Sequence, residues 1–247
     1  MLELVEYKVV HDTPDWLLFI PGLGCNPSDY ASIVPSLPFS SFSLNLYNFP
    51  LSVSSFSQLA ILISDQVEIL CSKHPHLAAK PIIVGHSMGG AIALECSHFS
   101  KAIISLEGNL SDECCGILSS KISAYTRRDF VNSFQSFLDT FRSSHVMKKW
   151  VECAIKWDPE SLHNASCVLV EWSRNRHQSP CKLVNKESFY YIYGQRSLPE
   201  HCLELLKDCD VNVDHVFEIP NAGHFIAWDN SWELQKTLLL ILEKVVS

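Results

Sequence analysis

Short apolar runs alternate with amphipathic stretches through the first hundred residues of this 247-residue chain. The segment from Leu4 to Val10 alternates as a half-buried strand does. Continuous apolar runs predict buried strands at residues 16–20, 42–47, 82–84 and 102–106. Apolar positions at helical spacing predict a helix from Ser57 to Cys71, and Asn26 or Ser28 is expected to cap a short helix that reaches Val34. This order of elements predicts a mostly parallel sheet with helices on both faces.

The pattern changes at about Asn109, where a polar, helix-like stretch begins. Apolar residues recur there at helical spacing and are expected to pack together or to line an apolar acyl pocket: Phe130, Phe134, Phe137, Leu138 and Phe141. The sheet pattern then resumes, with strands at 189–193 and 213–219 and helices at 199–208 and 231–246. We therefore expect an α/β core of residues 1–109 and 187–247, with residues 110–186 inserted between two strands as a helical lid.

The sequence Gly-x-Ser-x-Gly at residues 85–89 joins a predicted strand to a predicted helix. A nucleophile elbow needs this order, because its serine sits on a sharp, strained turn with the hydroxyl exposed above the sheet. Ser87 is the expected nucleophile. Gly85 and Gly89 would be glycines because a Cβ there would strike the neighbouring strand or helix. The alternative is an ordinary strand-to-helix turn, but the apolar strand before the motif and the small-residue helix after it favour the elbow.

Three motifs together resemble those of the α/β-hydrolase family over essentially the whole chain. Pro21-Gly22-Leu23-Gly24 stands where such enzymes usually show His-Gly-x-Gly, the elbow at Ser87 follows, and Asn221-Ala222-Gly223-His224-Phe225 lies between the last predicted strand and helix. The resemblance implies the α/β-hydrolase fold, a mostly parallel sheet flanked by helices, with the inserted helical lid.

The resemblance also implies roles for individual residues. A serine hydroxyl needs an imidazole to accept its proton, and His224 is the candidate. His86 lies beside the nucleophile in sequence and is expected to pack or to line the pocket. An oxyanion hole would use the backbone N–H groups of Leu23 and Met88. Replacing the usual histidine with Pro21 leaves the Leu23 donor in place.

The acid of the catalytic triad is where the chain departs from the family pattern. Most members carry it in a Gly-x-x-Asp turn, and the matching segment here ends in Ser197, which cannot hold a charge. Glu107 directly follows the strand at 102–106, which is similar to those haloalkane dehalogenases that place their acid after this strand. It is therefore the expected acid, the alternative being a structural carboxylate at the lid hinge. Weaker candidates are Asp112, Glu113 and Glu200.

The chemistry implied is attack of the serine on a small-molecule acyl ester or thioester through an acyl-serine intermediate, with no cofactor and no metal. One alternative is a carrier-protein-directed esterase, like the pimeloyl-carrier methyl ester esterases of biotin synthesis. Basic residues of the lid would then meet an acidic acyl-carrier protein: Lys121, Arg127, Arg128, Arg142, Lys148, Lys149 and Lys156. A second alternative is a non-catalytic, ligand-binding member of the fold, because the usual acid position is empty. Substrate or partner contacts are expected at His86, Phe134, Arg127, Arg128 and Arg142.

Charge and composition restrict the partners and the compartment. The net charge of −8 argues against a nucleic-acid partner, although residues 110–187 carry 11 Lys and Arg against 9 Asp and Glu. No apolar stretch is long enough to cross a bilayer, and the first residues show no signal peptide. We therefore expect a cytoplasmic protein whose ten cysteines, which lack a zinc spacing, are reduced thiols packed in the core.

Overall fold

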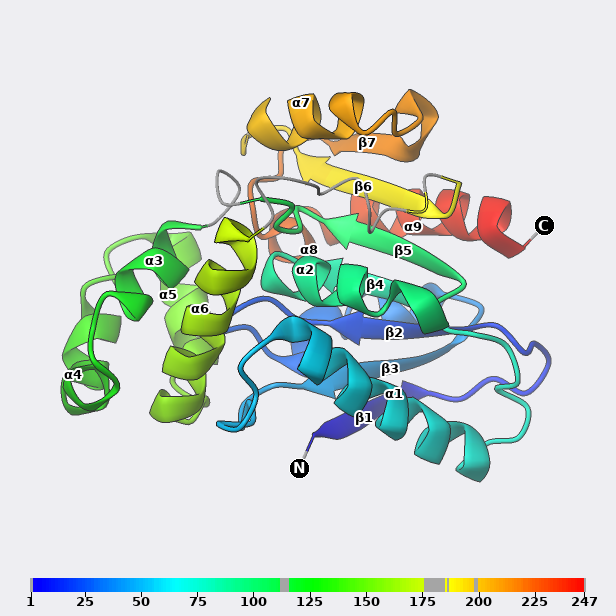
Figure 1. Ribbon diagram of the computed structural model, residues 1–247. Coiled ribbons are helices and arrows are strands. Elements are labelled where there is room, and N and C mark those ends of the chain that lie inside the picture. Colours follow the sequence, from blue (N-terminus) through cyan, green and yellow to red (C-terminus); the bar gives the residue numbers. More distant parts are fainter. Residues whose placement is uncertain (1, 112–115, 176–184, 186, 198–199, 247) are drawn as a thin grey trace.

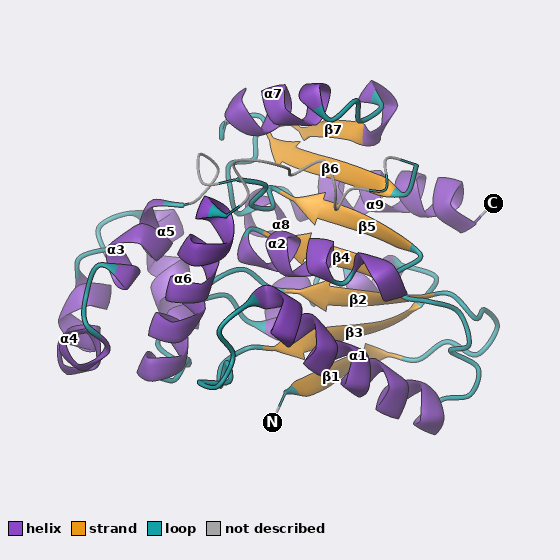
Figure 2. Ribbon diagram, viewed as in Figure 1, coloured by secondary structure: helices purple, strands orange, loops and turns teal. Residues whose placement is uncertain are grey.

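The computed structural model describes residues 2–111, 116–175, 185, 187–197 and 200–246. Within these residues, seven strands form one sheet in the order β1-β3-β2-β4-β5-β6-β7 (Figures 1 and 2). The strands are β1 (Glu3–Lys8), β2 (Trp16–Ile20), β3 (Ser40–Asn45), β4 (Ile82–His86), β5 (Ala102–Leu106), β6 (Phe189–Gly194) and β7 (Val216–Ile219). Strand β1 pairs antiparallel with β3, and the other pairs are parallel. The predicted mostly parallel sheet is confirmed.

Helices cover both faces of the sheet. Helices α1 (Phe56–Lys73) and α2 (Met88–Glu95) lie on one face, and α8 (Ile226–Asp229) and α9 (Ser231–Val246) lie on the other (Figure 1). Successive strand residues point to opposite faces, so Leu18 packs with the α1 and α2 side while Leu17 packs with α9. Burial on both faces explains why these strands are continuously apolar. None of the described helices combines the length and hydropathy of a membrane span.

Residues between β5 and β6 form the helices α3 (Ile117–Ser123), α4 (Arg127–Asp139), α5 (His145–Ala154) and α6 (Pro159–Arg174). Figure 1 shows them grouped beyond the end of the sheet at which the parallel strands terminate. The sequence begins two of them with side-chain caps: Thr126 accepts a hydrogen bond from the Asp129 amide at 3.2 Å, and Asp158 accepts one from the Ser161 amide at 2.8 Å.

The aromatic stripe of this segment differs from its prediction in one place. Helix α4 ends at Asp139, so Phe141 is not on the helix with Phe130 and Phe137. Its ring nevertheless lies 5.2 Å from that of Phe137, measured between centroids. Phe134 is half-buried and packs against Phe130 at 5.7 Å. The rings of the stripe therefore pack against one another and against neighbouring aromatic residues of the same segment, such as Trp150 and His163.

Two other predicted elements are shorter than expected. The helix expected up to Val34 is replaced by two 3₁₀ turns, Pro27–Tyr30 and Val34–Ser36, each with a proline at its start. The last strand begins at Val216 and not at Val213, because residues 213–215 form a 3₁₀ turn capped by the Asn212 side chain. Helix α7 (Glu200–Asp208) precedes this turn.

The cysteines also depart in part from the expectation. Free thiols are found at Cys25, Cys71, Cys96, Cys153 and Cys167. Cys202 and Cys209 are disulfide-bonded, so the prediction of reduced thiols is wrong for these two. Cys114, Cys115 and Cys181 lie outside the described residues.

Backbone segments approach so closely at the elbow that side chains are excluded there. A Cβ built on Gly89 would lie 2.0 Å from the carbonyl oxygen of Ile20, at the end of β2. A Cβ on Gly85 would lie 2.3 Å from the carbonyl oxygen of Gly89. Both obstacles are backbone atoms, which cannot rotate away as a flexible side chain would. The predicted reason for these glycines is therefore confirmed.

This crowding predicts that Gly89→Ala lowers the free energy of unfolding by about 2 kcal/mol or more. Alanine favours a helix by up to about 1 kcal/mol over glycine, so any loss must come from the contact with β2 and not from helix propensity. Gly116→Ala is the matched control, because no atom of the described residues lies within 4 Å of a Cβ built there. Urea denaturation of the three proteins measures the difference. Equal stability of Gly89→Ala and wild type would contradict the packing described.

Candidate active site

Ser87 lies on a strained turn between β4 and α2. Its backbone has φ 53° and ψ −118°, a conformation that costs a non-glycine residue about 1–3 kcal/mol. Hydrogen bonds hold it there: its amide donates to the Leu106 carbonyl at 3.0 Å, and its carbonyl accepts from Gly90 at 2.9 Å and from Asn109 at 3.2 Å. The turn is therefore fixed by the end of the neighbouring strand β5, and the hydroxyl side chain lines a cavity.

Sheet register brings Glu107 to the same edge as Ser87. His86 pairs with Leu106 in the parallel β4–β5 ladder, so the next residue of each strand leaves the sheet beside the other. The Glu107 backbone is also in the left-handed region, with φ 45°, and its amide donates to the Ile192 carbonyl of β6 at 2.8 Å. Its side chain is only 5% exposed. The carboxylate is thus buried among three strand ends.

The carboxylate of Glu107 receives hydrogen bonds at both oxygens. Oε2 lies 2.8 Å from Nδ1 of His224, and Oε1 accepts from the Gly194 amide at 2.7 Å and from the Ser197 hydroxyl. Burial alone would raise the pKa of Glu107, but the contact with His224 and the hydrogen bonds from Ser197 and Gly194 hold that pKa below its usual range. Glu107 is therefore ionised at neutral pH.

Ser197, at the position where the family pattern usually has an acid, has a different task here. Its hydroxyl donates to Glu107 Oε1 and lies 2.7 Å from the Gly194 carbonyl. A serine cannot pair with an imidazolium by charge, yet it can orient and stabilise a carboxylate that arrives from the adjacent strand. The position that usually carries the acid and the carboxylate that follows β5 are thus in direct contact.

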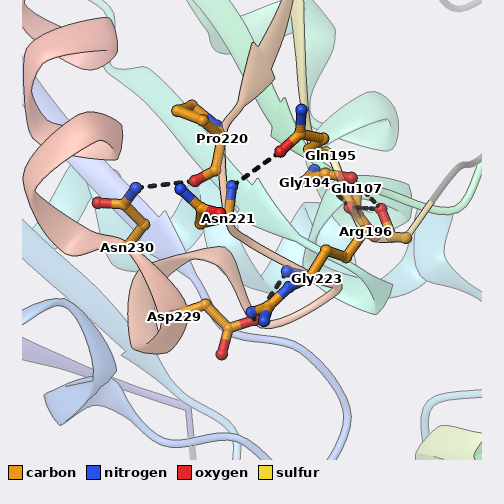
Figure 3. Close-up of polar contacts among 10 residues, drawn as sticks. Glu107, Gly194, Gln195, Arg196, Pro220, Asn221, Gly223, Asp229 and Asn230 are labelled. Atoms are coloured by element: carbon orange, nitrogen blue, oxygen red, sulfur yellow. Dashed lines mark hydrogen bonds and ion pairs between the residues drawn. The ribbon is translucent and has the colours of Figure 1, made fainter.

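The loop that carries His224 is fixed at its start by two side-chain amides (Figure 3). Oε1 of Gln195 accepts a hydrogen bond from the Asn221 amide at 3.2 Å, and Nδ2 of Asn230 donates to the Pro220 carbonyl at 2.8 Å. Asn221 adopts φ 56°, a conformation that asparagine tolerates better than most residues.

Asp229 fixes the same loop next to the histidine. Its Oδ2 accepts from the Gly223 amide at 2.7 Å and pairs with Nη2 of Arg196 at 3.2 Å (Figure 3). Sequence analysis did not identify Asp229, because a lone aspartate on a four-residue helix carries no motif. Only the fold reveals that it supports the histidine loop.

His86 is buried below His224 and is held neutral. Its Nε2 lies 2.8 Å from the His224 carbonyl oxygen, which can only accept, so Nε2 carries the proton. Burial and the neighbouring His224 ring lower the pKa of His86 to about 3. A nitrogen engaged in this way cannot take a proton from Ser87 through Nε2. His86 therefore packs beneath the site and lines the cavity, as predicted from its position.

Leu23 and Met88, the two expected oxyanion donors, lie on the segments next to Ser87. Met88 directly follows Ser87 and begins α2, where the first amides have no helical acceptor. Leu23 lines the same cavity as Ser87, and its neighbour Gly22 lies so close to the elbow that a Cβ there would be 3.2 Å from Cβ of Ser87. The role of these two amides stays a prediction.

A cavity of about 710 Å³ opens above these groups. Ser87, Glu107, His224 and Leu23 all line it. Apolar side chains of the inserted helices supply part of its wall: Ile117, Leu118, Met147 and Leu169.

Other candidate residues fall elsewhere. The cavity lining does not include Phe134, Arg127, Arg128 or Arg142, so the structure does not bring these to the site. Glu200 lines the cavity but is exposed, and Asp112 and Glu113 lie outside the described residues. No set of three or more His, Cys, Asp or Glu among the described side chains is arranged to hold a metal ion.

A parallel sheet with a strained serine turn, a histidine loop after the last strand and a buried carboxylate between them defines an α/β-hydrolase architecture. The Alpha/beta hydrolase family model matches residues 17–233, and the chain belongs to that family. The curated proteins contain no match to this sequence.

Several solved structures share the fold. MenH from S. aureus superposes with a TM-score of 0.72 at 13% identity and covers 100% of this chain and 99% of its own. A thermophilic esterase from Thermogutta terrifontis gives 0.71 at 16% identity, covering 100% and 94%. The esterase EaEST from Exiguobacterium antarcticum gives 0.68 at 13% identity, covering 100% and 95%. At these identities the likeness shows the fold.

The neutral, buried His86 predicts a pH dependence of stability. The unfolded chain binds a proton at the ordinary value of 6.5, whereas the folded state does so only near a pKa of about 3, so acid favours unfolding between these values. Its contribution should lower the free energy of unfolding by about 2 kcal/mol between about pH 7 and pH 5. His86→Gln keeps an N–H donor but does not titrate, so the free energy of unfolding of this variant should fall by about 2 kcal/mol less than that of the wild type between these pH values. Urea denaturation at both pH values is the measurement, and an unchanged slope in the variant would contradict the assignment.

Proposed function

We propose that this protein is a serine hydrolase that cleaves a carboxylic ester with a small or medium acyl group. The observation that carries the proposal is the arrangement of Ser87 on its strained turn beside a histidine loop held by a buried carboxylate. The esterases from Thermogutta terrifontis and Exiguobacterium antarcticum share this fold and support ester hydrolysis as the reaction class.

Glu107 sets the protonation of the base in this proposal. Its carboxylate accepts a hydrogen bond from Nδ1–H of His224, at the observed 2.8 Å, which leaves Nε2 as the unprotonated nitrogen. Nε2 takes the hydroxyl proton of Ser87 as the oxygen attacks the ester carbonyl. The carboxylate then stabilises the imidazolium that forms, while itself remaining ionised.

The amides of Leu23 and Met88 bind the negative charge that develops on the carbonyl oxygen. His224 returns its proton to the departing alcohol, which leaves the acyl group on Ser87. Water then attacks the acyl-serine with the same histidine as base, and the acid product departs. A thioester would follow the same steps with a thiol as the leaving group.

We also propose that residues 110–186 act as a lid on a core formed by residues 1–109 and 187–247. Side chains from α3, α5 and α6 line the cavity above Ser87, so a substrate would lie between these helices and the sheet edge. The apolar residues among them suit an acyl chain.

The carrier-protein alternative has weaker support. The basic residues expected to meet an acidic carrier are exposed, but Arg142 is paired with Asp139 at 2.7 Å and Lys149 lies over the Trp228 ring at 4.8 Å. Neither arrangement selects an acidic protein. A non-catalytic role is disfavoured because the usual acid position, Ser197, contacts an acid that is present at Glu107.

The nucleophile is tested by labelling with a fluorophosphonate. The folded protein should be labelled at Ser87, and Ser87→Ala should not be labelled, because only an activated serine attacks the probe rapidly. Peptide mass spectrometry identifies the site. A series of p-nitrophenyl esters graded by chain length, with an acyl-carrier ester beside them, then gives the acyl preference. A folded wild type that neither reacts with the probe nor hydrolyses any ester would refute the proposal.

The acid is tested by Glu107→Gln, which keeps the shape of the side chain but removes its charge. We expect kcat to fall by about 10²- to 10⁴-fold with little change in KM, because the histidine loses its orienting carboxylate. Glu218→Gln is the control, since that carboxylate lies on the exposed part of β7 and contacts the Tyr193 hydroxyl at 3.1 Å. A near-normal rate in Glu107→Gln would show that the acid lies elsewhere.

A further inference from the structure

An indole from the inserted helices contacts the loop that carries the Leu23 amide. Trp150 of α5 is fully buried, and its Nε1–H donates to the Leu23 carbonyl oxygen at 2.9 Å. The indole also lies directly against Gly24, where a Cβ would be 2.5 Å from Nε1. The contact spans 127 residues of sequence, so it exists only because α5 folds over this edge of the sheet.

Residues 22–25 form a tight turn whose shape depends on this contact. The Cys25 amide donates to the Gly22 carbonyl at 3.1 Å, and Gly24 has φ +72° at the third position, as in a type II turn. Types I and II differ by a flip of the central peptide, which here joins Leu23 to Gly24. Trp150 binds the carbonyl oxygen of that same peptide and therefore holds it in one orientation. The N–H of this peptide is that of Gly24, whereas the Leu23 amide belongs to the preceding peptide and is positioned only as part of the turn as a whole.

A second indole strengthens the restraint on the far side of the turn. Trp157 is buried just after α5, and its Nε1–H donates to the Cys25 carbonyl at 2.8 Å. The carbonyl oxygens of Leu23 and Cys25 thus both accept hydrogen bonds from tryptophans of the segment between β5 and β6. Among the described contacts, no side chain of residues 22–25 donates to either carbonyl oxygen.

We propose that Trp150 is a positioning residue for the reaction: by packing on Gly24 and binding the Leu23 carbonyl, it fixes the place of the turn at residues 22–25, and so keeps the Leu23 amide at the oxyanion. The inference rests on the proposed function. A preorganised donor is worth more in the transition state than in the ground state, since charge develops on the carbonyl oxygen only as the serine attacks. Trp150 therefore acts on kcat, through Leu23, without touching the substrate.

The test is Trp150→Phe, which keeps an aromatic ring but removes the N–H donor. We expect kcat to fall at least about 10-fold while KM stays within about threefold, because removing an oxyanion donor outright costs about 10²- to 10³-fold. The affinity for a boronic acid, which forms a tetrahedral adduct with the serine, should fall by the same factor as kcat. Trp172→Phe is the matched control: its Nε1–H donates to Glu95 at 2.7 Å, away from the cavity, and kcat should stay at the wild-type value.

A second replacement removes the donor alone. Benzothienylalanine at position 150 has the shape of tryptophan with sulfur in place of N–H, and the protein should fold as wild type does. It should reproduce the loss in kcat. A kcat within twofold of wild type in this variant, with any change confined to thermal stability, would overturn the positioning role. If the wild type itself fails to react with a fluorophosphonate, the proposed function fails first, so the two failures are distinguishable.

Discussion

A buried carboxylate needs compensation, and at the edge of this sheet the Glu107 carboxylate obtains it from the elements around it. Ionised groups are costly to bury unless they are paired and hydrogen-bonded. Glu107 follows β5, receives donors from Gly194 and Ser197 at the end of β6, and pairs with His224 from the loop after β7. The Glu107 side chain therefore connects the ends of three strands. If the His224 ring moved away, the buried carboxylate would lose that partner and keep only the hydrogen bonds from Gly194 and Ser197.

The carboxylate that contacts His224 follows β5, and this changes what the end of β6 supplies. The family pattern usually has an aspartate at the position of Ser197, in the turn after β6. Here β6 contributes donors in place of the charge, and the adjacent β5 contributes the charge. The positive φ of Glu107 turns the chain out of the sheet at that point, and the extra methylene of glutamate extends the reach toward His224.

Sequence patterns predicted the features that depend on local periodicity and on motifs. The buried strands at β2 and β5, the elbow glycines and the contact between Glu107 and His224 all agree with the structure. The chemical roles of these residues remain predictions. Asp229 and Trp150 were not identified, because each acts through a contact between distant segments, and no spacing along the chain encodes it. Phe134 was assigned to the site because helical periodicity reveals a face but not what that face packs against.

The pairing of the cysteines could not be predicted from the sequence for the same reason. Whether two sulfur atoms meet depends on the separation and direction of their Cβ atoms in space, and sequence gives neither. The disulfide-bonded state of Cys202 and Cys209 weighs against the cytoplasmic location expected, since disulfides persist mainly in oxidising compartments. The location therefore stays a prediction.

Helix α5 joins the inserted segment to both loops that surround Ser87. Its Trp150 binds the Leu23 carbonyl, while the adjacent Lys149 lies over the Trp228 ring, which stacks on Phe225 at 4.3 Å. Phe225 follows His224 directly. Consecutive residues of one helix thus contact the turn at residues 22–25 on one side and, through Trp228, the loop that carries His224 on the other. A displacement of α5 would disturb the positions of Leu23 and His224 together, so the helices that line the cavity also influence how the residues beneath it are arranged.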